Sequence, residues 1–465
     1  MEHIVFLTGR LAQPSLTRVL ESMAPAPFAW EVREIGLQVA GLMTADLIER
    51  RVTAPVKADR ILVPGRCRGD LDALSRHYGV PVVRGPEELK DLPAFFDRAA
   101  KPIDLSGHDI AIFAEIVDAP QLGVDAIVAR ARQLRADGAD VIDLGCLPAT
   151  AFSHLEDAVR ALKSEGFSVS VDSQDVEELR RGGRAGADYL LSLKPDTLWL
   201  ADEVNATPVL IGDSPADEAS LFRAIESMAG RGRPFFADSI LDPLPFGLTA
   251  SIVRYYRLRE RFPDVSIMMG SGNLTELTDA DTSGINAVLL GIAAELRASA
   301  ILTTQVAEHA RRVVREVDAA RRLMYAAREE QTLPKGLSEA LLTVHDRRPF
   351  PDTAEEIAAT ARAIRDPNFR VQVCAGGIHV YNRDGHHTAA DAFALFPHLK
   401  VESDGAHAFY LGVELARAEI ALQLGKRYVQ DQPLDWGVAA DKVGDQAADD
   451  LSSWHAVGTT LAHKR

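Results

Sequence analysis

The sequence predicts an α/β protein whose central part is a closed (β/α)8 TIM barrel of parallel strands. Three apolar runs support this prediction, because each reads as a strand and ends near a carboxylate: 141–145 (VIDLG), 169–173 (VSVDS) and 240–243 (ILDP). They recur at the spacing of a βα repeat. In such a barrel the carboxyl ends of all strands open onto one face. Asp143, Asp172 and Asp242 are therefore expected to meet at one ligand.

Eight βα units can be counted along the central part of the chain. Their predicted strands lie near 110–116, 140–145, 167–172, 188–193, 208–212, 235–241, 265–270 and 299–304. The intervening segments, such as 124–136, 216–228 and 250–261, carry apolar residues at helical spacing. Gly138 and Gly186 stand between helix and strand, where a helix end favours glycine. Eight near-continuous apolar strands indicate a closed parallel barrel rather than an open sheet.

Two smaller domains are expected to flank this barrel. Residues 1–103 alternate short apolar runs with helix-like segments, which is typical of a small open α/β sheet. Residues 104–332 form the barrel. Residues 333–465 show a mixed α and β (α+β) pattern, with a Gly376-Gly377 turn between two β-like runs and a strong helix near 411–424.

Composition narrows the classes of protein that this chain can represent. At 465 residues the chain is too long for one ordinary core, and 47% hydrophobic with 25% charged residues is typical of a soluble globular protein. No apolar run approaches the roughly 20 residues that span a bilayer, and the start of the chain lacks the charge pattern of a secretory signal. We therefore expect a cytoplasmic protein. The net charge of −16 argues against nucleic acid as a partner.

Cysteines and histidines offer no clear metal motif. The three cysteines, Cys67, Cys146 and Cys374, are too widely separated for a paired framework or a CxxC site. The C-terminal region contains His379, His386, His387, His398 and His407. No helical His-x-x-x-His pair occurs among them. We expect these histidines to be surface or structural residues.

Several barrel motifs occur in an order that resembles the dihydropteroate synthases and their pterin-binding relatives. The matching segments are 138–145 (GADVIDLG), 169–173 (VSVDS), 186–192 (GADYLLS), 241–243 (LDP) with 246–247 (FG), and 269–271 (MGS). The similarity covers roughly residues 108–330. The whole chain most resembles a divergent branch found in methanogens and in methylotrophic bacteria that use tetrahydromethanopterin. Residues 114–120 (AEIVDAP) and 407–412 (HAFYLG) carry that second resemblance.

The resemblance implies roles for the strand-end acids. A pterin presents a ring N–H beside an exocyclic amino group, and a carboxylate accepts both hydrogens in parallel. By resemblance, Asp242 holds this edge, Asp172 binds another pterin nitrogen and Asp143 shapes the adjacent loop. The alternative for Asp172 and Asp242 is an acid that caps the following helix.

The chain also departs from the family pattern where the family binds phosphate. The first-strand asparagine falls near Glu115 and Asp118, the fourth-strand asparagine near Leu191 or Ser192, the seventh-strand Ser-Arg-Lys at Ser271-Gly-Asn273, and the eighth-strand Arg-x-His at Leu302 and Thr304. In the family reaction an arylamine nitrogen displaces diphosphate from the pterin methylene carbon. Release of the diphosphate needs positive charge to stabilise the leaving oxygens, and most of this charge is missing here.

Two explanations of the missing charge remain open. In the first, Mg²⁺ held by Glu115 and Asp118 carries the diphosphate, assisted by Arg66 and Arg68 of a Gly-rich loop that follows a strand. The alternative for that loop is an ordinary solvated turn. In the second explanation there is no diphosphate, and the barrel binds an intact pterin, as the related methyltransferases do, with Asn273 bonded to a pterin nitrogen.

The first hypothesis for function is a dihydropteroate synthase-like transferase of tetrahydromethanopterin biosynthesis. It condenses 7,8-dihydropterin-6-ylmethyl diphosphate with 4-(β-D-ribofuranosyl)aminobenzene 5′-phosphate and releases diphosphate. Besides the acids, Ser192, Ser271, Asn273 and Thr304 are expected to bind substrate. The alternatives are a non-catalytic pterin-binding protein and a pterin-dependent methyltransferase. The resemblance also implies a homodimer.

Overall fold

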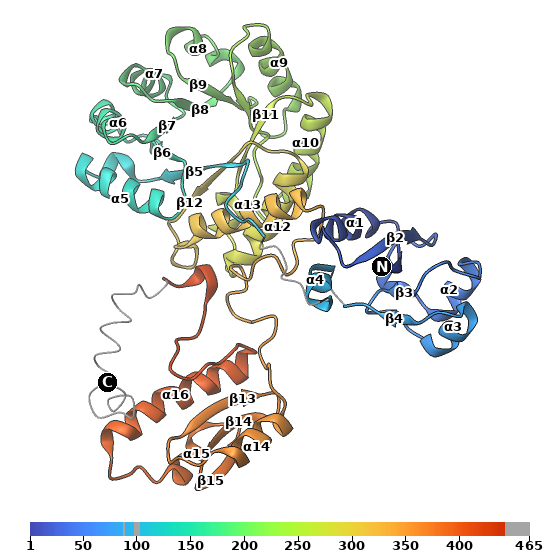
Figure 1. Cartoon of the computed structure of the whole chain (residues 1–465). Helices are drawn as coiled ribbons and strands as arrows, with labels where there is room; N and C mark the ends of the chain where they lie inside the picture. Colours follow the sequence, from blue (N-terminus) through green and yellow to red (C-terminus); the bar gives the residue numbers. More distant parts are fainter. Residues whose placement is uncertain (87–88, 97–102, 442–465) are drawn as a thin grey trace. The chain divides into compact units, whose positions relative to one another are not determined.

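The chain folds into three separate sheets, the largest of which is a closed barrel (Figure 1). The computed structural model describes residues 1–86, 89–96 and 103–441. The chain divides into two compact units: Met1–Gly107 with Tyr325–Leu337, and His108–Met324 with Ser338–Arg465. The division at residues 103 and 332 stays a prediction, and residues 97–102, just before its first boundary, lie outside the described part.

The barrel that the sequence predicts is confirmed, with all neighbouring strands parallel. Its strands are β5 Ala111–Ile116, β6 Val141–Gly145, β7 Ser168–Asp172, β8 Tyr189–Leu193, β9 Thr207–Leu210, β10 Phe236–Ala237, β11 Ser266–Gly270 and β12 Ala300–Thr304. Pairing of β12 with β5, from Ala300 opposite Ala111 to Thr304 opposite Glu115, closes the ring. Closure leaves no exposed edge strand, so every ladder hydrogen bond has a partner strand.

Helices surround the strands, as Figure 1 shows. They are α5 Val124–Ala136, α6 Leu155–Ser164, α7 Val176–Ala185, α8 Leu200–Glu203, α9 Glu218–Ala229, α10 Leu248–Arg261, α11 Gly272–Thr275, α12 Thr282–Glu295 and α13 Val313–Glu329, with short 3₁₀ turns η3 Ala119–Gln121, η4 Pro195–Thr197 and η5 Glu308–Ala310. The Asp175 carboxylate accepts the Glu177 N–H and starts α7, and Gly186, at φ +109°, ends it. Of the described helices, none is long and apolar enough to cross a bilayer.

Side chains fill the interior of the barrel, so it is not a channel. Phe113, Tyr189 and Phe236 meet edge to face, with centroids 4.9 Å apart for the first pair and 6.0 Å for Tyr189 and Phe236. Leu191 and Met268 belong to the same buried cluster. Alternate residues of the strands pack outward against the helices. Space for a ligand is therefore confined to the carboxyl ends of the strands.

Strand β10 is much shorter than the predicted strand at 235–241. The chain leaves the barrel at Asp238, whose Oδ1 accepts the Ile240 N–H at 2.6 Å, and Ile240 has φ +59°. Such a local side-chain bond competes with the ladder hydrogen bonds of a sheet. The run SILDP is therefore a loop, which changes which acid stands at the strand end.

The N-terminal unit contains the small open α/β sheet that the sequence predicts. Its elements are β1 Glu2–Thr8, α1 Gln13–Ser22, β2 Phe28–Glu34, η1 Ala40–Leu42, α2 Ala45–Arg51, β3 Arg60–Val63, α3 Leu71–Tyr78, β4 Val82–Arg84, η2 Leu89–Asp91 and α4 Leu92–Phe95. The strands are parallel in the order β2-β1-β3-β4. Separate apolar clusters cover its two faces.

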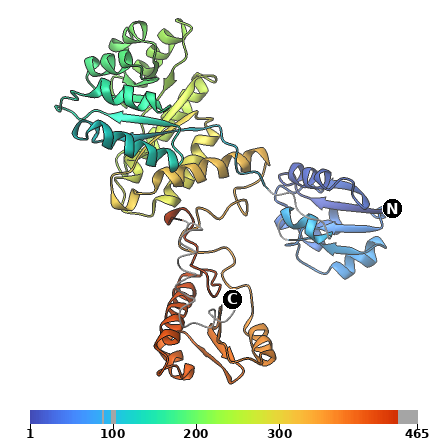
Figure 2. The ribbon, with the colours of Figure 1, turned by 60° about the vertical axis from the view of Figure 1, so that its left-hand side comes forward.

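The C-terminal region is built on an antiparallel sheet. It consists of α14 Ala354–Ala363, β13 Arg370–Cys374, β14 Gly377–Asn382, β15 Gly385–Ala389, α15 Ala392–Leu399, α16 Gly405–Leu424 and η6 Gly437–Ala439. Figure 2 shows α16 lying along the sheet, where it packs on β13 and β14. The turn between β13 and β14 was predicted, whereas the polar strand β15 was not. Helix α16 begins before the predicted 411 because the Asp404 carboxylate accepts the His407 N–H.

A stability test follows from the buried Arg321 of α13, which is 2% exposed. Its guanidinium donates to the Ile110 carbonyl at 2.6 Å and to the carboxylates of Asp140 and Asp318. Arg321→Met should lower the free energy of unfolding of the barrel by about 2–3 kcal/mol, because it removes the guanidinium that pairs with Asp140 and leaves Asp318 paired, among the described residues, with Arg322 alone. Hydrogen exchange of barrel peptides along a urea titration measures this. Arg160→Met, which breaks only an exposed pair with Asp157, should cost less than about 1 kcal/mol.

Candidate functional site

One cavity of about 650 Å³ opens at the carboxyl ends of the barrel strands. Its walls are apolar toward the barrel interior, where Leu191, Val209 and Met268 contribute. The remaining lining residues are Glu115, Val117, Asp172, Gln174, Ser192, Ile211, Asp238, Ile240, Leu241, Gly270, Gly272, Asn273, Glu276, Leu277, Leu302, Thr303, Thr304, Val306 and Ala307. An apolar pocket with a few convergent polar groups at this face of a barrel is the usual form of a ligand site.

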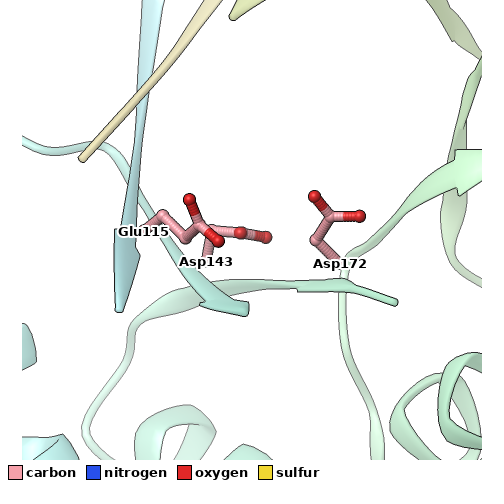
Figure 3. Close-up of side chains that lie close together, drawn as sticks. All are labelled: Glu115, Asp143 and Asp172. Carbon is pink, nitrogen blue, oxygen red and sulfur yellow. The ribbon is translucent and has the colours of Figure 1, made fainter. Parts of the chain in front are cut away.

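Three carboxylates from neighbouring strands gather at one side of this cavity (Figure 3). Glu115 of β5 lies opposite Asp143 of β6, and Asp172 of β7 lies opposite Gly145. One oxygen from each acid lies within 4.8 Å of the others. A Cβ on Gly145 would collide with the Glu115 carboxylate, so glycine leaves the space that Glu115 occupies.

Only part of the hydrogen-bonding capacity of this cluster is used inside the protein. Ser170 Oγ donates to Asp143 Oδ1 at 2.5 Å, and Ser192 Oγ donates to Asp172 Oδ1 at 2.6 Å. Asp143 is fully buried, yet its Oδ2 has no partner among the described residues. A buried polar atom without a partner is costly. The cluster therefore has acceptor atoms left for a cation or a ligand.

Burial raises the pKa values of all three acids, and repulsion by neighbouring carboxylates adds to this for Glu115 and Asp143. Burial, Asp172 and Glu276 together raise the pKa of Glu115 to about 7. The pKa of Asp143 is raised well above its usual range by burial and by Asp172 and Glu115. Burial also raises the pKa of Asp172, against the hydrogen bond from Ser192. The cluster retains protons near neutral pH unless a positive charge replaces them.

The cluster has the donor set that a hard divalent cation requires. Mg²⁺ prefers carboxylate oxygens and usually keeps several waters, so two or three acids beside an open cavity suffice. The unpartnered Asp143 Oδ2 supplies one such oxygen. The predicted metal pair was Glu115 with Asp118. The structure places Asp118 on an exposed turn outside the cluster and brings Asp143 and Asp172 to Glu115 instead.

Asp238 is a fourth buried acid that lines the cavity, and sequence reasoning missed it. It follows β10 directly, and burial raises its pKa to about 6 although the Tyr255 hydroxyl and the Ile240 N–H donate to it. The run Phe235-Phe236-Ala237-Asp238 has the same form as the strands that end at Asp143 and Asp172. The predicted strand ran to residue 241, so Asp242 rather than Asp238 was expected at its end.

Asp242 lies in the following loop and does not line the cavity. Its Oδ2 accepts a hydrogen bond from Arg254 Nη2 at 2.8 Å, and the same Nη2 donates to the Ile240 carbonyl at 2.8 Å. Arg254 is 8% exposed. In this conformation the Asp242 carboxylate is neutralised by a buried guanidinium, and its predicted role at the pterin edge stays a prediction.

The other predicted binding residues divide into two groups. Ser192, Asn273 and Thr304 line the cavity, with the Thr304 hydroxyl buried and without a partner among the described residues. Asn273 Nδ2 donates to the Leu241 carbonyl at 2.6 Å and so ties α11 to the loop after β10. Ser271 is fully buried outside the cavity, with its Oγ 3.3 Å from the Leu302 carbonyl oxygen.

Arg66 and Arg68 belong to the N-terminal unit and do not line the barrel cavity. Arg66 lines a separate cavity of about 190 Å³ at the carboxyl ends of β1, β3 and β4. Their predicted contribution to phosphate binding stays a prediction.

All ionisable side chains among the described residues that line the barrel cavity are acidic. Among the described residues that line it there is no lysine or arginine, whereas Glu115, Asp172, Asp238 and Glu276 all contribute carboxylates. Glu276 accepts the Val306 and Ala307 N–H groups at 3.0 and 2.7 Å. The protein alone therefore repels an anion from this cavity and favours ligand N–H groups or cations.

Comparisons with known proteins give partial matches. Residues 2–87 match a family of unknown function (DUF6513), and residues 392–431 match the family PterinBD-DUF4346. An uncharacterized protein of Methanocaldococcus jannaschii is 25% identical over 525 aligned positions, which cover 92% of this chain and 98% of that protein.

Among solved structures, the barrel is similar to dihydropteroate synthases. The enzyme of Yersinia pestis with a pterin-sulfa conjugate is 17% identical at a TM-score of 0.39 and covers 49% of this chain and 96% of that one. The enzyme from Xanthomonas albilineans with 7,8-dihydropteroate is 19% identical at a TM-score of 0.37, covering 50% and 96%. These similarities concern the fold alone, and the barrel is established by its own strand order.

The first test of the site is the pH dependence of cation binding. If Mg²⁺ displaces one proton from the cluster, its affinity should rise about tenfold between pH 6 and pH 8, because Glu115 titrates near 7. Isothermal titration calorimetry with Mg²⁺ measures this. Glu115→Gln should remove the pH dependence, whereas Asp118→Asn should behave as wild type. Loss of binding in Asp118→Asn would contradict the assignment.

The same acids predict that the empty site destabilises the fold. A carboxyl whose folded pKa is raised costs stability as pH rises from its unfolded pKa, near 4.5, to its folded value, near 7. Glu115→Gln should therefore raise the free energy of unfolding by about 2–3 kcal/mol at pH 8, but by less than about 1 kcal/mol at pH 5. Urea unfolding of cation-free protein at both pH values tests this, and equal effects at both would contradict it.

Proposed function

We propose that the barrel binds a reduced pterin and acts as a transferase of tetrahydromethanopterin biosynthesis. The substrates are 7,8-dihydropterin-6-ylmethyl diphosphate and 4-(β-D-ribofuranosyl)aminobenzene 5′-phosphate. The arylamine nitrogen forms a bond to the pterin methylene carbon, the bond from that carbon to the diphosphate oxygen breaks, and the nitrogen loses a proton.

The observation that carries this proposal is the set of carboxylates around a cavity with apolar walls. The amidine-like edge of a pterin offers two parallel N–H donors, which one carboxylate accepts together. Asp238 and Asp172 line the cavity and are both largely buried. A cavity of about 650 Å³ also falls in the size range of small-molecule sites.

The roles of the two acids follow from where they lie. Asp238 is fixed by Tyr255 and Ile240, so we assign it the amidine edge in place of Asp242. Asp172 is fixed by Ser192 and is assigned a second pterin nitrogen. Leu191, Val209 and Met268 provide the apolar surface against which the ring packs.

The side chains that line the cavity do not by themselves stabilise the leaving diphosphate. Glu115, Asp143 and Asp172 are the residues that would hold Mg²⁺, which when bound supplies positive charge for the leaving oxygens. The dependence of turnover on a divalent cation is therefore part of the proposal.

A second candidate function is a pterin-binding protein without catalysis. It is favoured by the lack of lysine and arginine among the described lining residues, because such a cavity suits an uncharged pterin better than a diphosphate ester. In this case the acids serve only as acceptors for ligand N–H groups.

Turnover distinguishes the two functions. Purified protein incubated with both substrates and Mg²⁺ should yield the coupled product and diphosphate, detected by mass spectrometry, and chelation of the cation should abolish the product. Tight binding of a reduced pterin without product, with or without Mg²⁺, would replace the transferase by the second candidate. Absence of pterin binding would overturn both.

A matched pair of variants tests the placement of the pterin. Asp238→Asn should weaken binding of a reduced pterin by about 30- to 1000-fold, equivalent to about 2–4 kcal/mol, because an acceptor becomes a donor facing a donor. Asp242→Asn should leave affinity nearly unchanged but lower the melting temperature of the empty protein, because Arg254 loses its charged partner. Calorimetric titration and thermal melts of both variants measure this. The reverse result would return the pterin edge to Asp242.

A further inference from the structure

The C-terminal sheet contains a group of titratable side chains that the barrel chemistry does not use. Cys374 ends β13, His379 lies in β14 and His386 in β15, and two hairpin turns bring them together. Cys374 packs with Ile357 and Ala361 of α14, so the group lies on the face of the sheet that α14 partly covers.

These three residues form a continuous chain of hydrogen bonds. Cys374 Sγ lies 3.1 Å from His379 Nε2, and His379 Nδ1 lies 2.9 Å from His386 Nε2. Thr388 Oγ1 is 3.2 Å from the same Nδ1, and the Gly376 N–H donates to Cys374 Sγ at 3.3 Å. A nucleophile that contacts a base, which is in turn held by a third group, is the arrangement of an activated thiol.

The protonation states that this chain of hydrogen bonds requires agree with the surroundings of the two histidines. Burial and the neighbouring His386 lower the pKa of His379, and burial lowers that of His386. Both rings are therefore neutral near pH 7. In the tautomer with hydrogen on Nδ1, His379 donates to His386 and leaves Nε2 free to accept the thiol proton. Exposed His386 connects the buried thiol to solvent.

We propose that Cys374 is a redox modification site whose co-substrate is a small hydroperoxide. As the sulfur attacks a peroxide oxygen, the thiol proton passes to His379 Nε2, the S–O bond forms and the O–O bond breaks. The leaving oxygen takes the proton from His379 and departs as water, or as an alcohol from an alkyl hydroperoxide. Sulfur is oxidised by two electrons to a sulfenic acid, and the peroxide is reduced by two electrons.

Two observations select this chemistry over others. Cys374 is 2% exposed, which disfavours bulky electrophiles far more than a reagent of a few atoms. A metal site is disfavoured, because the only group of three or more metal-ligating side chains in the described part of the chain is the barrel cluster. His379 Nδ1 is also already bonded to His386.

The chain supplies its own controls in Cys67 and Cys146. Burial raises the pKa of Cys67, and burial together with Glu178 raises the pKa of Cys146. The Sγ atoms of these two cysteines lie 3.9 and 4.0 Å from backbone carbonyl oxygens. Besides being largely buried, Cys146 faces the Glu178 carboxylate, which further raises its pKa, and neither thiol is hydrogen-bonded to a histidine in the described part of the chain as Cys374 is.

The test treats full-length wild-type protein with hydrogen peroxide, quenches it with catalase and unfolds it in iodoacetamide. Mass spectrometry of Glu-C peptides then gives the loss of free thiol at each cysteine. Cys374 should be oxidised at least about tenfold faster than the other two, since a positioned base accelerates such steps by about 100-fold or more. Equal rates at all three cysteines would overturn the proposal, whether or not any variant folds.

Three variants assign the roles within the chain of hydrogen bonds. His379→Gln should reduce the rate at Cys374 to that of Cys146. His386→Gln keeps an acceptor for His379 Nδ1 and should retain most of the rate, whereas His386→Leu should lose about tenfold. His398→Gln, which alters an exposed histidine stacked on His387, is the matched control and should change nothing. An unchanged rate in His379→Gln would overturn the proposal, and equal losses in both His386 variants would remove its positioning role.

Discussion

The in-register pairing of β5, β6 and β7 is the constraint from which the candidate site follows. It sets Glu115 beside Asp143 and Asp172 beside Gly145, and the closed ring prevents these strands from sliding apart. Three acids are thereby held close together and largely buried, where desolvation opposes ionisation and like charge adds to it for Glu115 and Asp143. The fold can keep this arrangement because the large apolar core around the ring stabilises the barrel independently of the acids.

The acids at this face of the barrel have different ion-pair and hydrogen-bond partners, and the difference indicates the role of each acid. Arg254 neutralises Asp242 with a full charge, whereas Asp238 receives only the Tyr255 hydroxyl and a backbone N–H. Asp143 has one oxygen with no partner in the described structure. An acid that is already paired contributes to stability, while a partly satisfied one retains affinity for a ligand. The unsatisfied acids are the ones at or beside the cavity.

The sequence predicted the barrel well because strand runs and helix ends are local signals. Helix α5 occupies the predicted 124–136, and Gly186 ends α7 as expected. The acidic cluster was predicted less well, since Asp118 and Asp143 are both near strand ends and only the pairing register shows which one reaches Glu115. Asp238 was missed because its own side chain accepts the Ile240 N–H and β10 ends at Ala237, before the predicted residue 241. The polar strand β15 carries no apolar alternation, so its histidines could not be placed beside Cys374.

The two candidate functions differ in what neutralises the acidic cluster, which is either protons or a divalent cation. In the proposed function, protons on the cluster lower the negative charge of the cavity, which then suits an uncharged pterin with its N–H groups facing Asp238 and Asp172. A divalent cation in place of those protons would supply the positive charge that the proposed anionic leaving group needs. Glu115, with a pKa of about 7, lies at the balance between these two states at neutral pH. A cation and a proton would therefore compete for the same oxygens, and under the proposed function that competition separates pterin binding alone from release of diphosphate.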